Sequence, residues 1–183
     1  MNNDILKTLY SQQDIQKRCQ QLGKLLATKY RHQKPLVIGV LKGAIMFMTD
    51  VIRNMDIYMQ IDFVDVSSYN GGTQSSGHVK LQKDIDTSVR GRNVLFIEDI
   101  IDTGRTLYFL QNLLKNRGAK SIRICTLFDK PENRLVDVKP DYVGFKVPDE
   151  FVVGYGMDYQ GEYRNLPYVG VLKPQIYSHP AKK

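Results

Sequence analysis

Two unbroken apolar segments constrain the fold of this chain more than any other feature. Residues 36–41 read Leu-Val-Ile-Gly-Val-Leu, and in the segment at residues 93–97 Asn93 is followed by the apolar run Val-Leu-Phe-Ile. Apolar runs of this length are typical of strands, and strands without polar alternation are covered on both faces, as in a parallel sheet. The sequence therefore predicts a sheet with these two strands in its interior.

The segments between the predicted strands have the spacing of amphipathic helices. Apolar side chains recur every three or four positions in two stripes, Ile15, Cys19, Leu22 and Leu26, and Leu107, Leu110 and Leu114. Ser11 and Asp14 precede the first stripe with the spacing of a capping box, which marks a helix start. Gly118 ends the second stripe as a cap. Residues 44–52 also read as a helix.

Weaker strand patterns complete the plan. Residues 61–67, 79–81 and 121–128 have strand character and alternate with the helical segments. Repeated strand–helix–strand units predict an α/β fold with a mainly parallel twisted sheet flanked by helices. Residues 68–77 are polar and glycine-rich, which predicts a mobile loop.

The chain changes character after residue 140. Prolines and glycines separate short β-like pieces there, with no strong helix. This composition predicts a small C-terminal lobe, a hood over the strand ends, rather than an independent domain. We therefore expect one domain over residues 1–183, in which about 140–172 form the lobe and 173–183 a tail.

Composition narrows the class of protein. A chain of 183 residues can bury a large core in one domain. No apolar run approaches the roughly 18 residues that span a bilayer, and the polar start, with Asp4, does not resemble a signal peptide. Cys19 and Cys125 lie far apart, which predicts a reducing, cytoplasmic location without a disulfide framework. The net charge of +7 suits polyphosphorylated small molecules, nucleic acid or a membrane surface, but no basic stripe interleaved with aromatics favours nucleic acid.

The most informative functional segment follows the strand at residues 93–97. Residues 102–106 read Asp-Thr-Gly-Arg-Thr and precede a predicted helix. Glycine and short hydroxyl side chains leave backbone N–H groups accessible at a helix start, which favours a phosphate. Glu98, Asp99 and Asp102 crowd the same place, and beside a phosphate they indicate Mg²⁺, a ribose diol or a cationic transition state. For a single acid, the alternative is a helix cap.

Other phosphate and metal motifs are missing from the sequence. No glycine-rich segment ends in Gly-Lys-Ser or Gly-Lys-Thr, which argues against a P-loop NTPase. Gly154 and Gly156 lack a third glycine at the dinucleotide-binding spacing. His32, His78 and His179 are dispersed, so neither a zinc site nor a histidine-based triad is indicated.

Residues 94–107 resemble the phosphoribosyl-pyrophosphate binding motif of the type I phosphoribosyltransferases. The acid pair followed by Asp-Thr-Gly is similar to the purine-salvage branch of that family, which acts on hypoxanthine and guanine. Residues 41–44, 68–69 and 147–159 agree with three further family segments in the same order. The resemblance covers the chain from about residue 4 to residue 172, with Met157 where the family often has leucine.

The resemblance implies a reaction and its partners. Phosphoribosyl pyrophosphate would give its 5-phosphoribose to N9 of hypoxanthine or guanine, with Mg²⁺ as cofactor, yielding IMP or GMP and pyrophosphate. The partners would be these small molecules, without nucleic acid or membrane, in a homodimer or homotetramer. Two alternatives stay open: an RNA-binding regulator of pyrimidine genes with a related fold, and a transferase that prefers xanthine. Those regulators lack the Glu-Asp-Ile-Ile-Asp pattern of residues 98–102.

The resemblance also implies roles for individual residues. Asp102 would be the catalytic base or acid at purine N7, and Glu98, Asp99 and Asp158 would bind Mg²⁺. The substrate-binding residues would be Lys42, Gly43, Ser68, Tyr69, Glu98, Asp99, Ile100, Asp102, Thr103, Gly104, Arg105, Thr106, Lys130, Phe151, Val152, Asp158 and Arg164.

Within this set, Lys130 would donate to the 6-oxo oxygen of the base, and Phe151 would stack on its ring. Val152 would present backbone groups to the base edge. Arg164 would hold pyrophosphate together with the N–H groups of residues 42–43, after a cis bond between residues 41 and 42. Residues 68–69 would close over the reacting centre. Taken singly, each of these side chains has an ordinary structural alternative, an exposed cation, a core ring or a surface ion pair.

Overall fold

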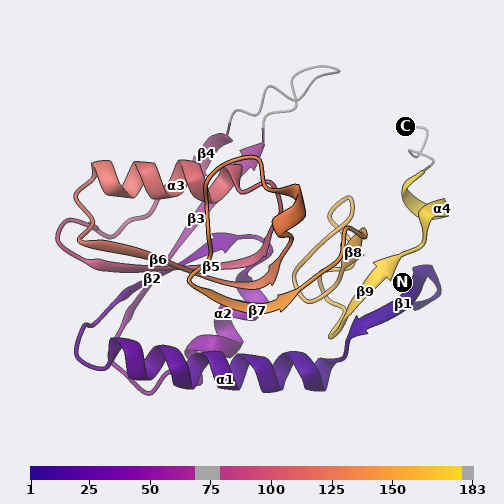
Figure 1. Ribbon diagram of the computed structural model, residues 1–183, viewed down its shortest axis with the longest axis horizontal. Coiled ribbons are helices and arrows are strands. Elements are labelled where there is room, and N and C mark those ends of the chain that lie inside the picture. Colours follow the sequence, from indigo (N-terminus) through magenta and orange to yellow (C-terminus); the bar gives the residue numbers. More distant parts are fainter. Residues whose placement is uncertain (69–78, 179–183) are drawn as a thin grey trace.

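The computed structural model describes residues 1–68 and 79–178, which form a six-stranded sheet, a three-stranded sheet and the helices around them (Figure 1). In chain order the elements are β1 (Ile5–Tyr10), α1 (Gln12–Tyr30), β2 (Leu36–Leu41), α2 (Ile45–Ile52), β3 (Gln60–Ser68), β4 (Val79–Lys83), β5 (Asn93–Ile101), α3 (Arg105–Asn116), β6 (Ser121–Asp129), β7 (Tyr142–Lys146), β8 (Val152–Val153), β9 (Val169–Leu172) and α4 (Pro174–Tyr177). The large sheet has the order β4-β3-β2-β5-β6-β7, and only β4 is antiparallel to its neighbour. The prediction of an α/β fold with a mainly parallel sheet is confirmed. No helix in the described ranges has the length and apolar character needed to cross a membrane.

The local signals in the sequence act as predicted. β2 and β5 are neighbours inside the large sheet, where Val37 lies opposite Leu95 and both are fully buried. At the start of α1, the Ser11 hydroxyl accepts a hydrogen bond from the Asp14 N–H at 3.2 Å, and the Asp14 carboxylate accepts one from the Ser11 N–H at 3.2 Å. This reciprocal pair is the predicted capping box.

One strand differs from its predicted length in a way that matters for the site. β5 continues to Ile101, past the predicted end at residue 97, because its ladder with β6 runs on to the pair Ile101 and Asp129. Glu98 and Asp99 therefore lie within the strand, instead of in a loop that follows it. Their backbone is held by the sheet, which fixes the direction of each side chain.

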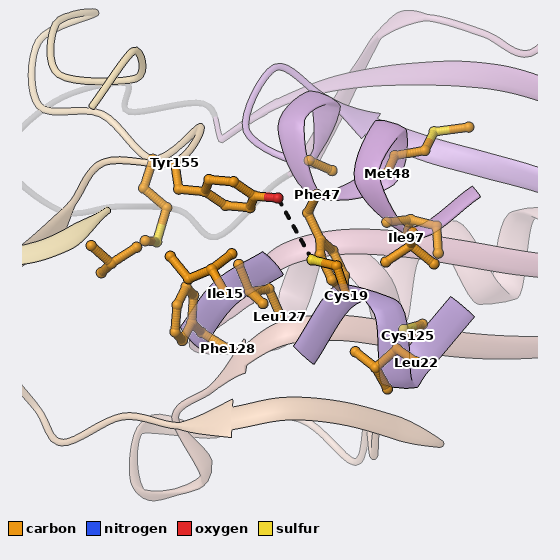
Figure 2. Close-up of a cluster of buried hydrophobic side chains, with 14 of the residues drawn as sticks. Ile15, Cys19, Leu22, Phe47, Met48, Ile97, Cys125, Leu127, Phe128 and Tyr155 are labelled. Atoms are coloured by element: carbon orange, nitrogen blue, oxygen red, sulfur yellow. Dashed lines mark hydrogen bonds between the residues drawn. The ribbon is translucent and has the colours of Figure 1, made fainter. Parts of the chain in front are cut away.

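The helices cover the two faces of the large sheet, α1 and α2 on one face and α3 on the other (Figure 1). Figure 2 shows the core under α1 and α2, where Ile15 and Phe47 pack with the strand residues Ile97 and Leu127. Cys19 lies in this core, is not in a disulfide, and has a pKa that burial raises to about 11. This thiol is therefore a packing group rather than a reactive one.

The small sheet brings β1, near the N-terminus, beside β8 and β9 from the later part of the chain (Figure 1). β1 pairs antiparallel with β9, and β9 pairs antiparallel with β8. The sequence did not predict β1, which is part of the small sheet. Of the strands within the lobe expected at about 140–172, only β8 and β9 lie in the small sheet. β7 belongs to the large sheet beside β6. Arg18 of α1 also holds β7 on the core, donating to the carbonyls of Val143 at 2.6 Å and Gly144 at 2.9 Å.

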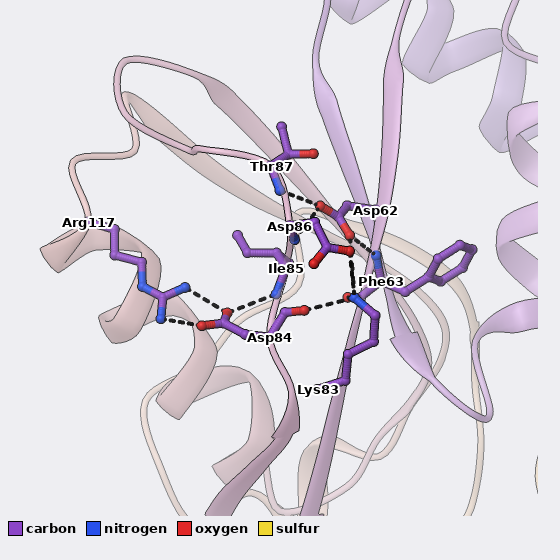
Figure 3. Close-up of polar contacts among 8 residues, drawn as sticks. All are labelled: Asp62, Phe63, Lys83, Asp84, Ile85, Asp86, Thr87 and Arg117. Carbon is purple, nitrogen blue, oxygen red and sulfur yellow. Dashed lines mark hydrogen bonds and ion pairs between the residues drawn. The ribbon is translucent and has the colours of Figure 1, made fainter.

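A buried carboxylate fixes the chain after β4 (Figure 3). Asp62 of β3 is 7% exposed and accepts hydrogen bonds from the N–H groups of Asp86 at 3.0 Å and Thr87 at 2.8 Å. On the other side of this segment, Arg117 donates to both carboxylate oxygens of Asp84 at 2.7 Å. The β3–β4 hairpin is thus anchored at its base, on strands that lead toward the predicted loop.

Candidate active site

The carboxyl ends of three parallel strands meet at one edge of the large sheet. β2 ends at Leu41, β5 at Ile101 and β6 at Asp129, and the three strands are neighbours in that order. Ligands of open parallel sheets bind outside such ends. The lobe formed by β8, β9 and the residues between them (152–172) reaches the same edge, because a Cβ atom added to Gly156 would lie 2.0 Å from the carbonyl oxygen of Gly43. The strand ends and the lobe therefore border one site.

A cavity of about 240 Å³ lies between the ends of β5 and β6 and the lobe. It is lined by Asp99, Ile100, Asp102, Lys130, Phe151, Val152, Met157 and Asp158. All of these except Met157 are in the set of expected substrate-binding residues. Segments that are far apart in the sequence are thus brought together as the resemblance implies.

A smaller hollow of about 100 Å³ lies at the start of α3. It is lined by Glu98, Ile100, Ile101, Asp102, Thr103, Gly104, Thr106 and Leu107, so it shares Ile100 and Asp102 with the cavity. Gly104 is the N-cap residue of α3, with a φ of +82°, and has no side chain to cap the first turn, where the Arg105 N–H makes a long bond of 3.5 Å to the Thr103 hydroxyl. The N–H groups of that turn and the helix dipole suit a phosphate. Because Gly104 holds the N-cap position, the helix-cap alternative for Asp102 does not apply.

Glu98 and Asp99 form the acidic part of the site. Glu98 is 8% exposed, and its Oε2 atom has no hydrogen-bond partner among the described residues. Burial, together with the neighbouring Asp99 carboxylate, raises the pKa of Glu98 well above its usual value. Burial also raises the pKa of Asp99, although the Ile100 N–H donates to its Oδ1 at 2.8 Å. A cation at this pair would relieve both effects.

The acid pair fits Mg²⁺. Proteins usually hold this ion with one or two carboxylates and complete its shell with water and substrate oxygens. Within the described part of the chain, no three His, Cys, Asp or Glu side chains are grouped as a protein-only cage. Asp158, the third expected ligand, has its Oδ1 at 2.6 Å from Arg164 Nη2 and accepts a hydrogen bond from the Gly161 N–H at 2.8 Å.

Lys130 and Phe151 lie on the lobe side of the cavity. The Lys130 ammonium donates to the carbonyl of Glu150 at 2.7 Å and lies 3.8 Å from an Asp149 carboxylate oxygen, and the side chain is only 11% exposed. Phe151 is 39% exposed, unusually high for a ring beside a core. A buried cation next to an accessible ring suits a planar ligand with an oxygen acceptor.

The turn after β2 is the most crowded part of the site. The peptide bond between Leu41 and Lys42 is cis, as the resemblance implies. A Cβ atom added to Gly43 would lie 1.7 Å from Asp99 Oδ2. Arg164 Nη1 donates to the Gly156 carbonyl at 2.6 Å, which ties this cation to the lobe segment that touches Gly43. Lys42, Gly43 and Arg164 are thus gathered near the acid pair.

Arg134 was not expected in the site, yet its guanidinium binds the backbone at the end of β5 and the start of the loop before α3. Nε donates to the Asp102 carbonyl at 3.1 Å, Nη1 donates to the Val138 carbonyl at 2.5 Å, and Nη2 forms an ion pair with Asp129. A Cβ atom added to Gly104 would lie 2.7 Å from Arg134 Cδ. No sequence signal marks this role, because three of its acceptors, the carbonyls of Ile101, Asp102 and Val138, are backbone groups.

Tyr155 is a second residue that sequence reasoning missed. Its hydroxyl donates to Asp50 of α2 at 2.5 Å and lies 3.6 Å from the Cys19 sulfur (Figure 2). The ring therefore ties the lobe segment to both core helices. Of the two expected closing residues, Ser68 is the last residue of β3, and Tyr69 lies outside the described residues with the remainder of the predicted loop.

Comparison with known proteins adds an independent finding. Residues 7–160 match the family model of the phosphoribosyl transferase domain. A hypoxanthine-guanine phosphoribosyltransferase of Bacillus subtilis is 58% identical over 177 residues, which are 97% of this chain and 98% of that protein. The bifunctional protein TilS/HprT of Listeria monocytogenes is 58% identical over 178 residues, and this chain spans 28% of its length. The crystal structure of a hypoxanthine phosphoribosyltransferase from Staphylococcus aureus has a TM-score of 0.94 and 49% identity, covering 98% of this chain and 97% of that one.

Proposed function

The chain belongs to the phosphoribosyl transferase family, and from this membership and the site geometry we propose that it is a purine-salvage transferase. The reaction moves 5-phosphoribose from phosphoribosyl pyrophosphate to N9 of hypoxanthine or guanine, giving IMP or GMP and pyrophosphate. The observation that carries the proposal is the pair of adjoining hollows that share Ile100 and Asp102. A nucleotide has a base at one end, a phosphate at the other and a ribose between them, which matches this arrangement.

The larger cavity has the chemistry of a 6-oxopurine site. In the proposed complex, the Lys130 ammonium donates to the 6-oxo oxygen and the Phe151 ring stacks on the base. In the same complex, the backbone of Val152, which lines the cavity, bonds the base edge. Adenine fits this site poorly, because its 6-amino group is a donor and would face another donor.

The acidic residues stabilise charge on the ribose and accept the proton that the purine loses. As the C1′–O bond to pyrophosphate breaks and the C1′–N9 bond forms, positive charge develops on the ribose, and the buried Glu98–Asp99 pair stabilises it. The purine gives up a proton in the same step, and Asp102, which lines both hollows, accepts it at N7. The N–H groups at the start of α3 hold the 5′-phosphate.

The remaining residues serve the leaving group. Arg164 and the N–H groups of Lys42 and Gly43 bind pyrophosphate. Glu98 and Asp99 would hold Mg²⁺, and when bound this ion would supply Lewis-acid stabilisation of the departing charge. Asp158, which pairs with Arg164 in the free protein, would contribute to holding a second Mg²⁺. We further propose a cytoplasmic enzyme that assembles as a homodimer or homotetramer.

A panel of bases tests the proposal directly. Hypoxanthine, guanine, xanthine and adenine are each incubated with the protein, phosphoribosyl pyrophosphate and Mg²⁺, and nucleotide formation is followed by chromatography. We expect IMP and GMP from the first two bases and no product from adenine. Xanthine as the best substrate would select the alternative preference, and conversion of no 6-oxopurine would refute the proposed function.

Asp102→Asn tests the role of Asp102 as a base. The amide keeps the shape of the side chain but cannot accept the proton, so kcat should fall about 10²- to 10⁴-fold, the usual contribution of positioned acid–base catalysis. The KM values should change little, because the lost interaction belongs to the transition state. Asp56→Asn, on an exposed loop, is the matched control. Near-normal turnover of Asp102→Asn would remove this residue from the mechanism.

A further inference from the structure

The C-terminal segment after β9 contacts one of the residues that line the larger cavity. α4 is a short helix at Pro174–Tyr177, beyond the region that resembles the family. The Tyr177 ring stacks on the Phe151 ring, with 4.9 Å between ring centroids and 20° between ring planes. Tyr159 meets the same ring edge-on, with 5.5 Å between centroids and 89° between planes. Phe151 is therefore held by two other aromatic rings.

The stacked ring lies outside the cavity. Phe151 lines the cavity, whereas Tyr177 does not. Because Tyr177 covers one face of the Phe151 ring, the 39% of Phe151 that stays exposed lies away from Tyr177. The accessible part of Phe151 is thus available to a ligand while the covered face is supported.

Hydrogen bonds of Leu172 and Lys173 hold the chain in place just before α4, the helix that carries Tyr177. The Leu172 N–H donates to the carbonyl of Phe151 itself at 2.9 Å. The Lys173 N–H donates to the Asp4 carbonyl at 2.9 Å, and the Lys173 ammonium donates to the Asn3 carbonyl at 2.6 Å. Residues 172–173 are therefore bonded both to the N-terminal turn and to Phe151, the residue whose ring Tyr177 contacts.

We propose that Tyr177 is a positioning residue for the base, so that the C-terminal segment forms part of the base site. An exposed phenylalanine ring samples several orientations, and binding a base on it requires one of them. The stacked Tyr177 ring keeps Phe151 in a single orientation before the base arrives, which lowers the entropy lost on binding. This inference rests on the proposed function and deepens it.

Two substitutions in the full chain test the inference. Tyr177→Ala removes the supporting ring, and Tyr177→Phe keeps the ring but removes the hydroxyl. An aromatic pair contributes enough that the KM for hypoxanthine should rise about 3- to 10-fold in Tyr177→Ala. The kcat and the KM for phosphoribosyl pyrophosphate should stay within about twofold, and Tyr177→Phe should behave as the unchanged protein. Tyr58→Ala, which removes an 85% exposed ring, is the matched control.

Each possible result decides the inference. An unchanged hypoxanthine KM in Tyr177→Ala would overturn it, as would Tyr177→Phe losing as much as Tyr177→Ala. A lower hypoxanthine KM would show that the ring competes with the base, which is the opposite role. If Tyr177→Ala does not fold, the Tyr177→Phe result and a Tyr177→Leu variant, which keeps apolar volume without a ring, still separate stacking from packing. Failure of the unchanged protein to convert any 6-oxopurine would instead refute the proposed function.

Discussion

Replacing Arg134 by methionine tests whether one guanidinium holds the phosphate loop in place. Methionine keeps most of the apolar stem of the side chain and removes every donor. The variant loses the bond from Nε to the Asp102 carbonyl, the bond from Nη1 to the Val138 carbonyl and the ion pair with Asp129. The loop that lines the smaller hollow then keeps its backbone bonds, such as the one from the Leu135 N–H to the Thr103 carbonyl at 3.0 Å, but loses the side-chain bonds of Arg134.

The size of the effect follows from what stays buried. Asp129 is 7% exposed, so Arg134→Met leaves a buried carboxylate without its cation, and breaking a buried pair in this way costs about 3–5 kcal/mol of unfolding free energy. Asp129→Asn leaves the guanidinium with its carbonyl acceptors, so this change should cost only about 1.5–3 kcal/mol, the range for a charged hydrogen bond. The double variant buries no unpaired charge, and its loss should be smaller than the sum of the two single losses.

Urea unfolding of the four proteins measures these differences. Arg53→Met is the control, because Arg53 is exposed at the end of α2 and its loss should change stability by no more than about 0.5 kcal/mol. A loss below about 1 kcal/mol for Arg134→Met, or strict additivity in the double variant, would refute the reasoning. The KM for phosphoribosyl pyrophosphate should also rise in Arg134→Met, since the Asp102 carbonyl is released.

Three other changes probe base binding, backbone geometry and charge. Lys130→Ala should weaken hypoxanthine binding by about 1.5–3 kcal/mol, the value of a charged hydrogen bond, and leave phosphoribosyl pyrophosphate binding almost unchanged; equal losses in steady-state kinetics would contradict the base contact. Gly156→Ala should lower the melting temperature more than Gly161→Ala, because φ is positive at both positions but only at Gly156 would the new Cβ atom meet a backbone atom, 2.0 Å from the Gly43 oxygen; equal losses would contradict the crowding. Burial alone would raise the pKa of Asp62, but hydrogen bonds from the N–H groups of residues 63, 86 and 87 outweigh it and lower that pKa below 3.8. A lowered pKa in the folded state stabilises the protein above the unfolded-state value and is lost as pH falls through the folded-state value, so the stability gap between the unchanged protein and Asp62→Asn should shrink below about pH 4 in urea unfolding; a constant gap from pH 7 to pH 3 would contradict it.

The fold was predictable where its signals are local. The Ser11–Asp14 capping box and the leucine stripe of α3 depend on neighbours three or four positions away, so a single sequence displays them. The apolar run at residues 36–41 likewise indicates, from its own composition, that the strand is buried. From these elements, the general rule for ligands at strand ends predicts the edge where residues 98–106 and Lys130 meet.

The remaining features depend on partners that are distant in the sequence. β1 reads as a short mixed segment and becomes a strand only because β9, near the other end of the chain, pairs with it. The same holds for Arg134, whose acceptors include backbone carbonyls, and for the Tyr177 ring on Phe151. Backbone carbonyls are present at every residue, so no pattern of residue types reveals which of them a side chain will bind.

Lys130, the cation that we propose binds the base, already has a hydrogen-bond partner in the free site, and this bears on how the site would distinguish one base from another. Lys130 donates to the Glu150 carbonyl at 2.7 Å, which uses one of the three N–H donors of its ammonium and holds the group in place before any ligand arrives. A 6-oxo group can accept a hydrogen bond from a second N–H of the ammonium while the bond to Glu150 stays in place. A 6-amino group offers no acceptor, so Lys130 keeps its bond to Glu150 and the amino group loses its water without gaining a partner. The discrimination against adenine therefore arises because its 6-amino group is buried without a hydrogen-bond partner. Leaving a buried polar group unpaired costs more free energy than a formed hydrogen bond contributes.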